Sequence, residues 1–307
     1  MFDLIIIGSG PAGLHAAVYA KRAGLNMLII EKNPVSGGQI IDTYEVDNYL
    51  GIPGVNGFDL AMKFREHADK LGAEFADGIV TGIEKLQGEN GKTVFKVNTE
   101  NASYETRTVV IAAGAHHSKL GIPGEEEYIG KGVSYCATCD GAFYKGKVAA
   151  VNGGGDVAVE DAIFLARFCE KVYLIHRRDE LRAAKILQDE LFGLPNVEVI
   201  WDSVVQEIKG EDKVTTLRVK NLKENTDSDL NVDGIFVAIG IHPTTESFAN
   251  IVECDENGYI IAGEDCATNV PGIFAAGDCR KKRLRQIVTS VADGANAVTA
   301  AQDYLIL

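Results

Sequence analysis

Two cysteines with two residues between them, Cys136 and Cys139 in "YCATCDG", could do redox chemistry, and an acid, Asp140, follows at once. Zinc normally takes four ligands, and no second CxxC, CxxH or HxxxH stands elsewhere in the sequence, so no metal site is predicted. A disulfide across so short a loop removes little chain entropy, which disfavours a structural staple. The pair therefore predicts thiol chemistry, in which one thiol forms and breaks a bond to its neighbour as electrons arrive.

A source of electrons is indicated near the N-terminus, where the apolar run "FDLIIIG" predicts a parallel strand buried on both faces. The run leads into "GSGPAG", in which Gly8, Gly10 and Gly13 have GxGxxG spacing, then into a helical stretch and a second strand that ends at Glu31. Such glycines allow a tight turn and let the backbone approach a pyrophosphate, while the acid can accept hydrogen bonds from a ribose. Glycines that serve only a tight packing turn are the alternative.

The same order of elements occurs a second time, in "KVAAVNGGGDVAVEDAIFLARFCEKVYLIHRR". Gly153, Gly155 and Ala158 form GxGxxA in this repeat. His176 stands at the position that Glu31 holds in the first repeat, so the acid is missing. The repeat predicts a second dinucleotide site with a different ribose preference.

The segment after the second strand of this repeat, "HRRDELR", is basic. It places Arg177, Arg178 and Arg182 at a strand end, and guanidinium groups bind phosphate through paired donors. The cluster therefore indicates a 2'-phosphate, and hence NADPH in preference to NADH. A solvated basic loop paired with Asp179 and Glu180 is the alternative.

The length and composition fit a globular protein of two domains. The chain has 307 residues, of which 46% are hydrophobic and 24% charged. A formal charge of -14 disfavours nucleic acid and anionic lipid as partners. The first residues have neither a membrane-spanning run nor the basic leader of a signal peptide, which predicts no membrane association and a cytoplasmic location.

Taken together, these motifs resemble those of the bacterial-type, low-molecular-weight thioredoxin reductases, in the class II pyridine nucleotide-disulfide oxidoreductase family. The resemblance covers essentially the whole chain and rests on "GSGPAG", "GGQI", "CATCDG", "GGGDVAVEDA", "HRRDELRA" and "GIFAAGDCRKKRLRQIVTSVADGA". It implies an α/β fold with two Rossmann-like dinucleotide-binding domains, one for FAD and one for NADPH, the NADPH domain being inserted into the FAD domain.

The order of the motifs and the turn-rich stretches between them give the expected domain limits. Residues 1–114 and 244–307 are predicted to form a discontinuous FAD-binding domain, and residues 115–243 an NADPH-binding domain that carries the CxxC pair. The edges fall in "GAHHSKLGIPGE" and "AIGIHPTT", which are the expected hinges. The family is understood to rotate its domains, so that the flavin can face the disulfide and the nicotinamide in turn.

The resemblance also implies roles for individual residues. Cys139 would face the flavin, Cys136 would attack the partner's disulfide, and Asp140 would serve as acid and base, unless it only caps a turn before Gly141. The predicted FAD-binding residues are Gly8, Gly10, Pro11, Ala12, Gly13, Glu31, Gly38, Gln39, Asn48, Gly114, Gly277, Asp278, Arg285, Gln286 and Ile287. The predicted NADPH-binding residues are Gly153, Gly155, Asp156, Val157, Ala158, His176, Arg177, Arg178, Arg182, Ile239 and Gly240.

The function that follows is NADPH-dependent reduction of thioredoxin by a cytoplasmic homodimer, through FAD and the Cys136/Cys139 disulfide. The alternatives are a reductase of another small redox protein or peroxidase component, a ferredoxin-fed or oxygen-using relative, and a non-catalytic flavin redox sensor. Intact "GGGDVA" and "HRRDELR" argue against ferredoxin and oxygen. The intact CxxC pair beside an acid argues against a sensor.

Several residues depart from the family pattern or lie outside its motifs. Ala113, Ser118 and Leu50 replace the threonine, arginine and proline that are common there, and Ala113 removes a hydroxyl near the expected FAD crossover. The run "RKKRLR", residues 280–285, is expected to be mainly a solvated loop. The remaining cysteines are expected to behave as small buried hydrophobes: Cys169, Cys254, Cys266 and Cys279.

Overall fold

The computed structural model describes residues 1–43, 45–88 and 92–306, which divide into two compact units. The first unit contains residues 1–43, 49–116 and 242–306, and the second contains residues 117–241 with the short stretch 45–48. The assignment of one cofactor to each unit stays a prediction.

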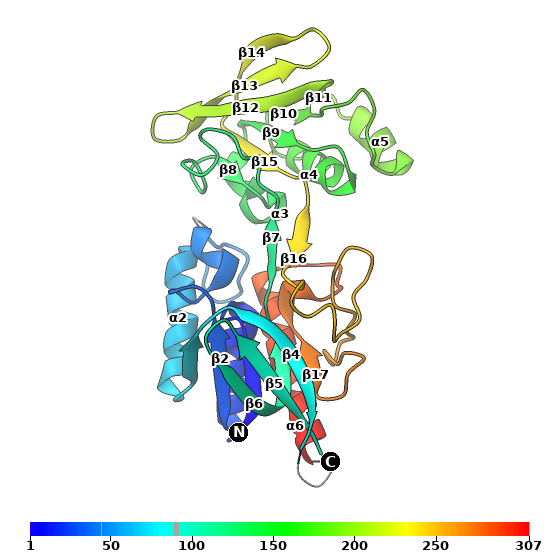
Figure 1. The fold of residues 1–307 in the computed structure, drawn as a ribbon. Helices are drawn as coiled ribbons and strands as arrows, with labels where there is room; N and C mark the ends of the chain where they lie inside the picture. Colours follow the sequence, from blue (N-terminus) through cyan, green and yellow to red (C-terminus); the bar gives the residue numbers. More distant parts are fainter. Residues whose placement is uncertain (44, 89–91, 307) are drawn as a thin grey trace. The chain divides into compact units, whose positions relative to one another are not determined.

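The first unit is built on parallel strands in the order β3-β2-β1-β6, and β17 pairs with the end of β6 (Figure 1). The strands are β1 (Phe2–Ile7), β2 (Met27–Glu31), β3 (Glu74–Asp77), β6 (Ser103–Ile111) and β17 (Ile273–Ala275). The apolar run at the N-terminus is β1 itself, and its side chains from 4 to 7 are buried. The prediction of a strand buried on both faces is confirmed.

The remaining elements of this unit extend and cover the sheet. β4 (Val80–Gln87) and β5 (Thr93–Thr99) pair antiparallel, and β5 pairs antiparallel with the start of β6. The helices are α1 (Pro11–Arg22), α2 (Gly57–Lys70) and α6 (Ile287–Ile306). α1 and α6 pack closely because Gly294 leaves room, since a Cβ there would overlap the Ala12 carbonyl oxygen.

The second unit contains a separate parallel sheet in the order β11-β10-β9-β15-β8. The strands are β8 (Val133–Ser134), β9 (Val148–Asn152), β10 (Lys171–Ile175), β11 (Val197–Ile200) and β15 (Gly234–Val237). Together with the first sheet, this arrangement confirms the predicted α/β fold class with two Rossmann-like units.

Further elements complete the second unit. α4 (Asp156–Ala166) follows β9, and α5 (Lys185–Phe192) precedes β11. β12 (Ser203–Gly210), β13 (Val214–Asn221) and β14 (Thr226–Asn231) form an antiparallel sheet. Apolar side chains of β12 and β13 share one buried cluster with those of β9, β10 and β15, which fixes this sheet to the parallel one.

Two of the unit boundaries fall in β7 (Ala115–His117) and β16 (Ile241–Pro243), which pair with each other. At the unit boundaries, the Ser118 amide donates to the Gly240 carbonyl oxygen at 2.9 Å, and the Thr244 amide to that of Gly114 at 3.0 Å. None of the helices in the described ranges combines the length and apolar character needed to cross a bilayer.

Candidate functional site

Of the three glycines in the first turn, the outer two pack against backbone and the middle one faces open space. Gly8 has a φ of +100°, and a Cβ there would lie 2.5 Å from the Ala112 carbonyl oxygen. A Cβ on Gly13 would overlap the Gly8 carbonyl oxygen. At Gly10 an added Cβ would meet only the Gly38 Cα, at 4.0 Å. Packing therefore explains Gly8 and Gly13, whereas the space over Gly10 fits the approach of a pyrophosphate to the start of α1.

The acid that ends β2 is held beside this turn. The Glu31 carboxylate accepts from the Ser9 amide at 2.6 Å, from the Ser9 hydroxyl at 2.7 Å and from the Asn33 amide at 2.9 Å. A carboxylate can accept about four hydrogen bonds, so Glu31 keeps capacity for a ribose hydroxyl. The structure thus places Glu31 where the sequence predicts a ribose contact.

Two charged residues of the C-terminal segment, one in η4 (Gly277–Cys279) and one after it, are half-buried. Burial raises the pKa of Asp278, although the Ser290 hydroxyl donates to its Oδ1 at 3.0 Å and opposes that effect. The Nε of Arg285 is buried and has no hydrogen-bond partner among the described residues, while its guanidinium lies 3.9 Å from the centre of the Tyr259 ring. A buried donor without a partner is what a site shaped for a polar ligand would leave, so these residues fit a bound flavin nucleotide.

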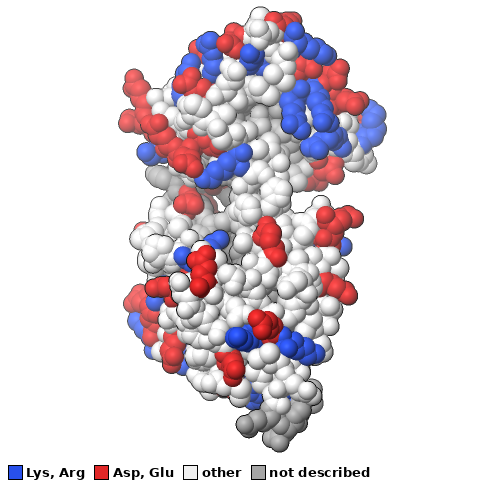
Figure 2. Space-filling view, in the orientation of Figure 1, with Lys and Arg blue, Asp and Glu red and all other residues white. Residues whose placement is uncertain are grey.

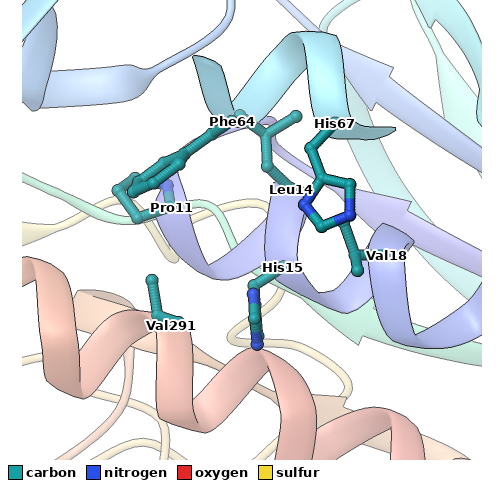
Figure 3. Close-up of a pocket in the computed structure, with 7 residues that line it drawn as sticks. All are labelled: Pro11, Leu14, His15, Val18, Phe64, His67 and Val291. Atoms are coloured by element: carbon teal, nitrogen blue, oxygen red, sulfur yellow. The ribbon is translucent and has the colours of Figure 1, made fainter. Parts of the chain in front are cut away.

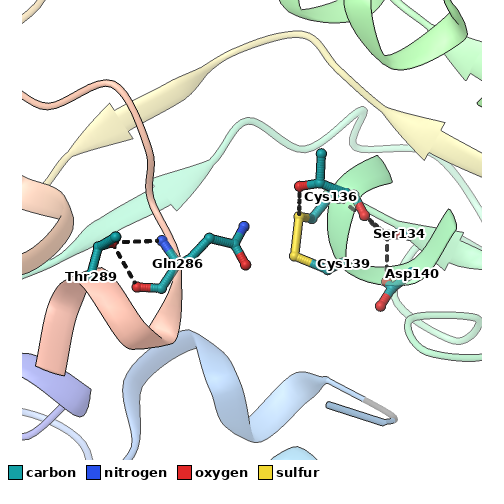
Figure 4. Close-up of a disulfide and its surroundings, with 7 residues drawn as sticks. Ser134, Cys136, Cys139, Asp140, Gln286 and Thr289 are labelled. Atoms are coloured by element: carbon teal, nitrogen blue, oxygen red, sulfur yellow. Dashed lines mark hydrogen bonds between the residues drawn. A yellow bond between two sulfur atoms is a disulfide. The ribbon is translucent and has the colours of Figure 1, made fainter. Parts of the chain in front are cut away.

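Most of the other predicted FAD residues lie in the same unit. Gly38 and Gln39 open η1 (Gly38–Asp42), and a Cβ on Gly38 would lie 3.4 Å from the Gly10 Cα, so η1 adjoins the glycine turn. The Gln286 amide donates to the Thr289 hydroxyl at 3.1 Å where α6 begins (Figure 4). The other predicted positions in this unit are Pro11, Ala12 and Ile287 at helix starts, Gly277 in η4, and Gly114. Asn48 differs, because it lies in the stretch 45–48, which groups with the second unit.

The second glycine turn repeats the pattern of the first. A Cβ on Gly153 would lie 2.5 Å from the Ala238 carbonyl oxygen and 2.6 Å from the Ala158 Cβ, whereas a Cβ on Gly155 would meet nothing within 4 Å. The middle position is again the open one. Of the other predicted NADPH residues, Asp156 and Val157 begin α4, and Ile239 and Gly240 follow β15.

The loop after β10 folds back on this turn through His176. The imidazole is buried against Gly154, and its Nε2 lies 3.0 Å from the Glu180 carbonyl oxygen. The Arg182 amide donates to the Gly154 carbonyl oxygen at 2.7 Å. Burial lowers the pKa of His176. The ring therefore packs within the protein, where it holds the basic loop in place.

The three arginines of this loop are exposed, and no ion pair holds Arg177, Arg178 or Arg182 within the part of the chain that the structure describes. Asp179, which the alternative interpretation pairs with them, lies 3.1 Å from the Nζ of Lys223 instead. On the face shown in Figure 2, basic and acidic side chains of the second unit are interspersed. The arginines are available for a 2'-phosphate.

Cys136 and Cys139 form a disulfide at the start of α3 (Ala137–Asp140), with their Cα atoms 5.3 Å apart (Figure 4). The amides of Cys139 and Asp140 both donate to the Cys136 carbonyl oxygen, at 3.2 and 3.1 Å. The short helix therefore fixes both sulfurs and the acid in one turn of backbone.

Asp140 is held by Ser134, which ends β8. The Ser134 hydroxyl donates to Asp140 Oδ2 at 2.6 Å (Figure 4). Burial raises the pKa of Asp140, and this hydrogen bond opposes the rise. Asp140 makes no side-chain capping bond to the turn at Gly141, which was the alternative to an acid–base role. A carboxyl group with a raised pKa can exchange protons closer to neutral pH.

Two features of the site were not foreseen from the sequence. One is Ser134, whose only signal is a hydroxyl two residues before the first cysteine. The other is a buried ion cluster: Asp293 lies 2.7 Å from Arg280 and 2.6 Å from Lys282, and it accepts from the Gly277 amide at 2.9 Å. The expectation of a solvated loop is wrong for Arg280 and Lys282, because buried Asp293 draws both cations inward.

The cysteines outside the disulfide mostly follow expectation. Cys169, Cys266 and Cys279 are buried, and burial raises the pKa of Cys279 to about 12, so its thiol stays protonated. Cys254 differs because it is only half-buried. None of these thiols is suited to act as a nucleophile at neutral pH.

A small pocket lies between α1, α2 and α6 (Figure 3). Its volume is about 20 Å³, which holds about one water molecule. His15 and His67 border it, and burial together with the neighbouring His67 lowers the pKa of His15. The pocket is too small for a dinucleotide.

The sequence and the fold were compared with those of known proteins, and both match over nearly the whole chain. The family model "Pyridine nucleotide-disulphide oxidoreductase" matches residues 2–294. The thioredoxin reductase of Listeria innocua is 47% identical over 306 residues, covering 99% of this chain and 94% of its relative. That of Bacillus subtilis is 46% identical over 306 residues, covering 99% and 95%. The crystal structure of thioredoxin reductase from Streptococcus pyogenes matches with a TM-score of 0.95 and 47% identity, covering 100% and 98%.

The chain belongs to the pyridine nucleotide-disulphide oxidoreductase family. It is an oxidoreductase that uses FAD and NADPH, and the resemblance to thioredoxin reductases drawn from its motifs is confirmed.

Proposed function

We propose that this protein catalyses the NADPH-dependent reduction of thioredoxin. The observation that carries the proposal is the Cys136–Cys139 disulfide on α3, with the half-buried carboxyl group of Asp140 beside it. A chain with two open glycine turns can hold both an electron donor and a flavin, and a disulfide between closely spaced cysteines is a suitable electron acceptor.

The residues described above divide the work of holding the cofactors. The space over Gly10, the carboxylate of Glu31 and the buried Nε of Arg285 are suited to FAD. The space over Gly155 and the exposed arginines that follow His176 are suited to NADPH. When bound, the flavin supplies the step that takes a hydride from NADPH and passes two electrons onward.

The disulfide and its neighbours complete the reaction. Two electrons break the Cys136–Cys139 bond, and Asp140 protonates one of the resulting sulfurs. In the second half, the Cys136 thiolate attacks the partner's disulfide, and Cys139 then displaces the partner by re-forming the original bond. Proton return to Asp140 readies the site for another cycle.

The partner and setting complete the proposal. The relatives from Listeria and Bacillus are named as thioredoxin reductases, which supports thioredoxin as the acceptor. We place the protein in the cytoplasm, where dithiols are kept reduced, and we propose a homodimer, the commonest form of soluble oligomer.

An anaerobic titration of the FAD-loaded protein tests the electron source. Loss of the oxidised flavin absorbance should be rapid with NADPH and slow with NADH. Absent bleaching with both would refute the proposal and point to ferredoxin or oxygen at that end of the chain.

A second experiment tests the disulfide. Cys136→Ser should abolish the reduction of thioredoxin while FAD stays bound. Cys254→Ser is the matched control, because that thiol is partly exposed but forms no disulfide, and it should retain turnover. Unchanged turnover in Cys136→Ser would refute the mechanism, and reduction of only a different small redox protein would change the partner.

A further inference from the structure

Ser134 stands at the centre of the contacts that join Asp140 to the first cysteine. Ser134 is the last residue of β8 and is only 6% exposed. The hydroxyl lies 2.6 Å from Asp140 Oδ2, accepts from the Cys136 amide at 3.1 Å and lies 3.4 Å from the Cys136 carbonyl oxygen (Figure 4). One side chain therefore contacts both the acid and the backbone of the redox pair.

The hydrogen-bonding capacity of a hydroxyl matches both states of the acid. A serine has one proton to donate and two lone pairs. When Asp140 is ionised, the Ser134 proton points to Oδ2. When Asp140 is protonated, its own proton can be donated to Ser134, whose hydroxyl proton then turns to the carbonyl oxygen of Cys136. In both states a lone pair of Ser134 remains for the Cys136 amide, so the hydroxyl proton, the carboxyl proton and the amide each have an acceptor.

We propose that Ser134 is a positioning residue that provides a hydrogen-bond partner to both protonation states of Asp140, and that it thereby sets the pH range in which Asp140 exchanges protons with the redox pair. The role in turnover rests on the proposed function. The contacts to Asp140 and Cys136 do not depend on which partner the dithiol reduces.

The proton balance shows why such a residue is needed. Reduction of one disulfide to two thiols takes two electrons and two protons. The hydride from NADPH accounts for both electrons and one proton, and Asp140 supplies the other, which it regains from water. A carboxylate shielded from water is disfavoured when it has no donor, and Asp140 is half-buried. Loss of the Ser134 hydroxyl would therefore favour the protonated form of Asp140 and slow the release of its proton to the redox pair.

The first test measures Asp140 directly. In protein labelled with ¹³C at the aspartate carboxyl groups, the Asp140 signal is assigned by its loss in Asp140→Asn and is titrated in the wild type, Ser134→Ala and Ser134→Thr. Ser134→Ala should raise the pKa of Asp140 by about one unit or more, because a donor to the charged form is lost. Ser134→Thr should restore the wild-type value. An unchanged or lowered pKa in Ser134→Ala would overturn the proposal.

The second test follows turnover between about pH 5 and about pH 9. The limb of the rate profile that reports Asp140 should move to higher pH in Ser134→Ala, by the same amount as the pKa. Ser203→Ala is the control, because Ser203 is also buried in the same unit and donates to the Trp201 carbonyl oxygen at 2.7 Å. A shifted profile in the control, or an unshifted one in Ser134→Ala, would contradict the inference.

The two experiments separate the two proposals. If the wild type does not reduce thioredoxin, the proposed function fails, whereas the titration of Asp140 still decides the role of Ser134. If Ser134→Ala does not bind FAD or fold, Ser134→Cys replaces it, because a thiol is a weak donor of similar shape. That variant should show a smaller upward shift, and no shift would overturn the proposal.

Discussion

The two glycine turns share a backbone design but differ at the end of the second strand of each repeat. In the first, the Glu31 carboxylate is tied to Ser9 and directed to the turn. In the second, His176 is buried against Gly154, and the arginines that follow it are exposed. Under the proposed assignment of FAD to the first turn and NADPH to the second, the comparison teaches that one strand–turn–helix scaffold takes a different ligand when the charge at a single strand end changes sign.

The two turns also differ in how closely the helix that follows each of them approaches the turn. The last residue of the GxGxxG motif is Gly13, where a Cβ would overlap the Gly8 carbonyl oxygen. The corresponding residue of the GxGxxA motif is Ala158, whose Cβ is accommodated. α1 therefore lies closer to its glycine turn than α4 does. Tight contact in the first turn suits a cofactor that stays bound.

The largest effect is expected from Gly13→Ala. The new Cβ would meet backbone, which cannot yield cheaply, so the free energy of unfolding should fall by roughly 3–5 kcal/mol, with loss of FAD. Ala158→Gly is the comparison in the second repeat and should cost only about 1 kcal/mol. Urea denaturation measures both, and equal losses would remove the distinction between the turns.

Asp293→Asn should have the next largest effect, because the first unit has a buried ion cluster behind its site. Loss of the charge leaves Arg280 and Lys282 without their partner, and the expected cost is about 3 kcal/mol. The exposed pair in the second unit supplies a control, Asp227→Asn, with a cost below about 1 kcal/mol. Similar losses of unfolding free energy in the two variants, measured by urea denaturation, would show that burial does not increase the contribution of the cluster to stability.

The Asp293 carboxylate should also make the stability of the fold depend on pH. Burial alone would raise the pKa of Asp293, but hydrogen bonds from Arg280 and Lys282 hold it below its ordinary value. The stabilising effect of the ionised Asp293 carboxylate is therefore complete above its pKa in the unfolded chain, about 4. It is lost as the pH falls through the lower pKa that Asp293 has in the folded protein. Asp293→Asn should lose less stability on acidification than the wild type does.

The double change Arg177→Ala, Arg178→Ala tests the charge difference between the turns. Loss of paired donors to a 2'-phosphate should weaken NADPH binding by about 100-fold and leave NADH nearly unchanged. Calorimetric titration of both nucleotides measures this, with Arg218→Ala as a control far along the chain that is paired with Asp227. Equal loss for both nucleotides would refute the 2'-phosphate role.

The smallest effect concerns a position at which the two helices of the repeats differ. Asp161 of α4 corresponds to the fully buried Ala16 of α1. Burial, with a smaller contribution from Glu160, raises the pKa of Asp161 to about 7. A raised folded pKa means that ionisation destabilises the fold, at a cost that grows from about pH 4 to about pH 7.

Asp161→Asn should therefore raise the free energy of unfolding at about pH 8 by up to about 1 kcal/mol, and should change it little near about pH 4. The gain is no larger because the Asp161 side chain is partly exposed. The control Asp189→Asn removes an exposed carboxylate of α5 and should show no such trend. Thermal unfolding at both pH values decides the matter.

The sequence was sufficient for features that depend on neighbours along the chain. β1 follows from its apolar run, and both glycine turns follow from spacing, because local periodicity decides these elements. Ser134 and the Asp293 cluster depend on contacts across folded backbone. Lys282 and Arg280 look like part of a solvated run until α6 packs on α1 and buries Asp293. No pattern in the sequence records that packing.

The paired strands β7 and β16 bear on the order in which the nascent chain can fold. Everything in the second unit from residue 117 to residue 241 is synthesised as one continuous segment. The first unit begins earlier but waits for β17 and α6, which packs against α1. On the ribosome the inserted unit is therefore complete while the surrounding one is still missing its last strand and helix, so the part of the chain that starts second can finish first.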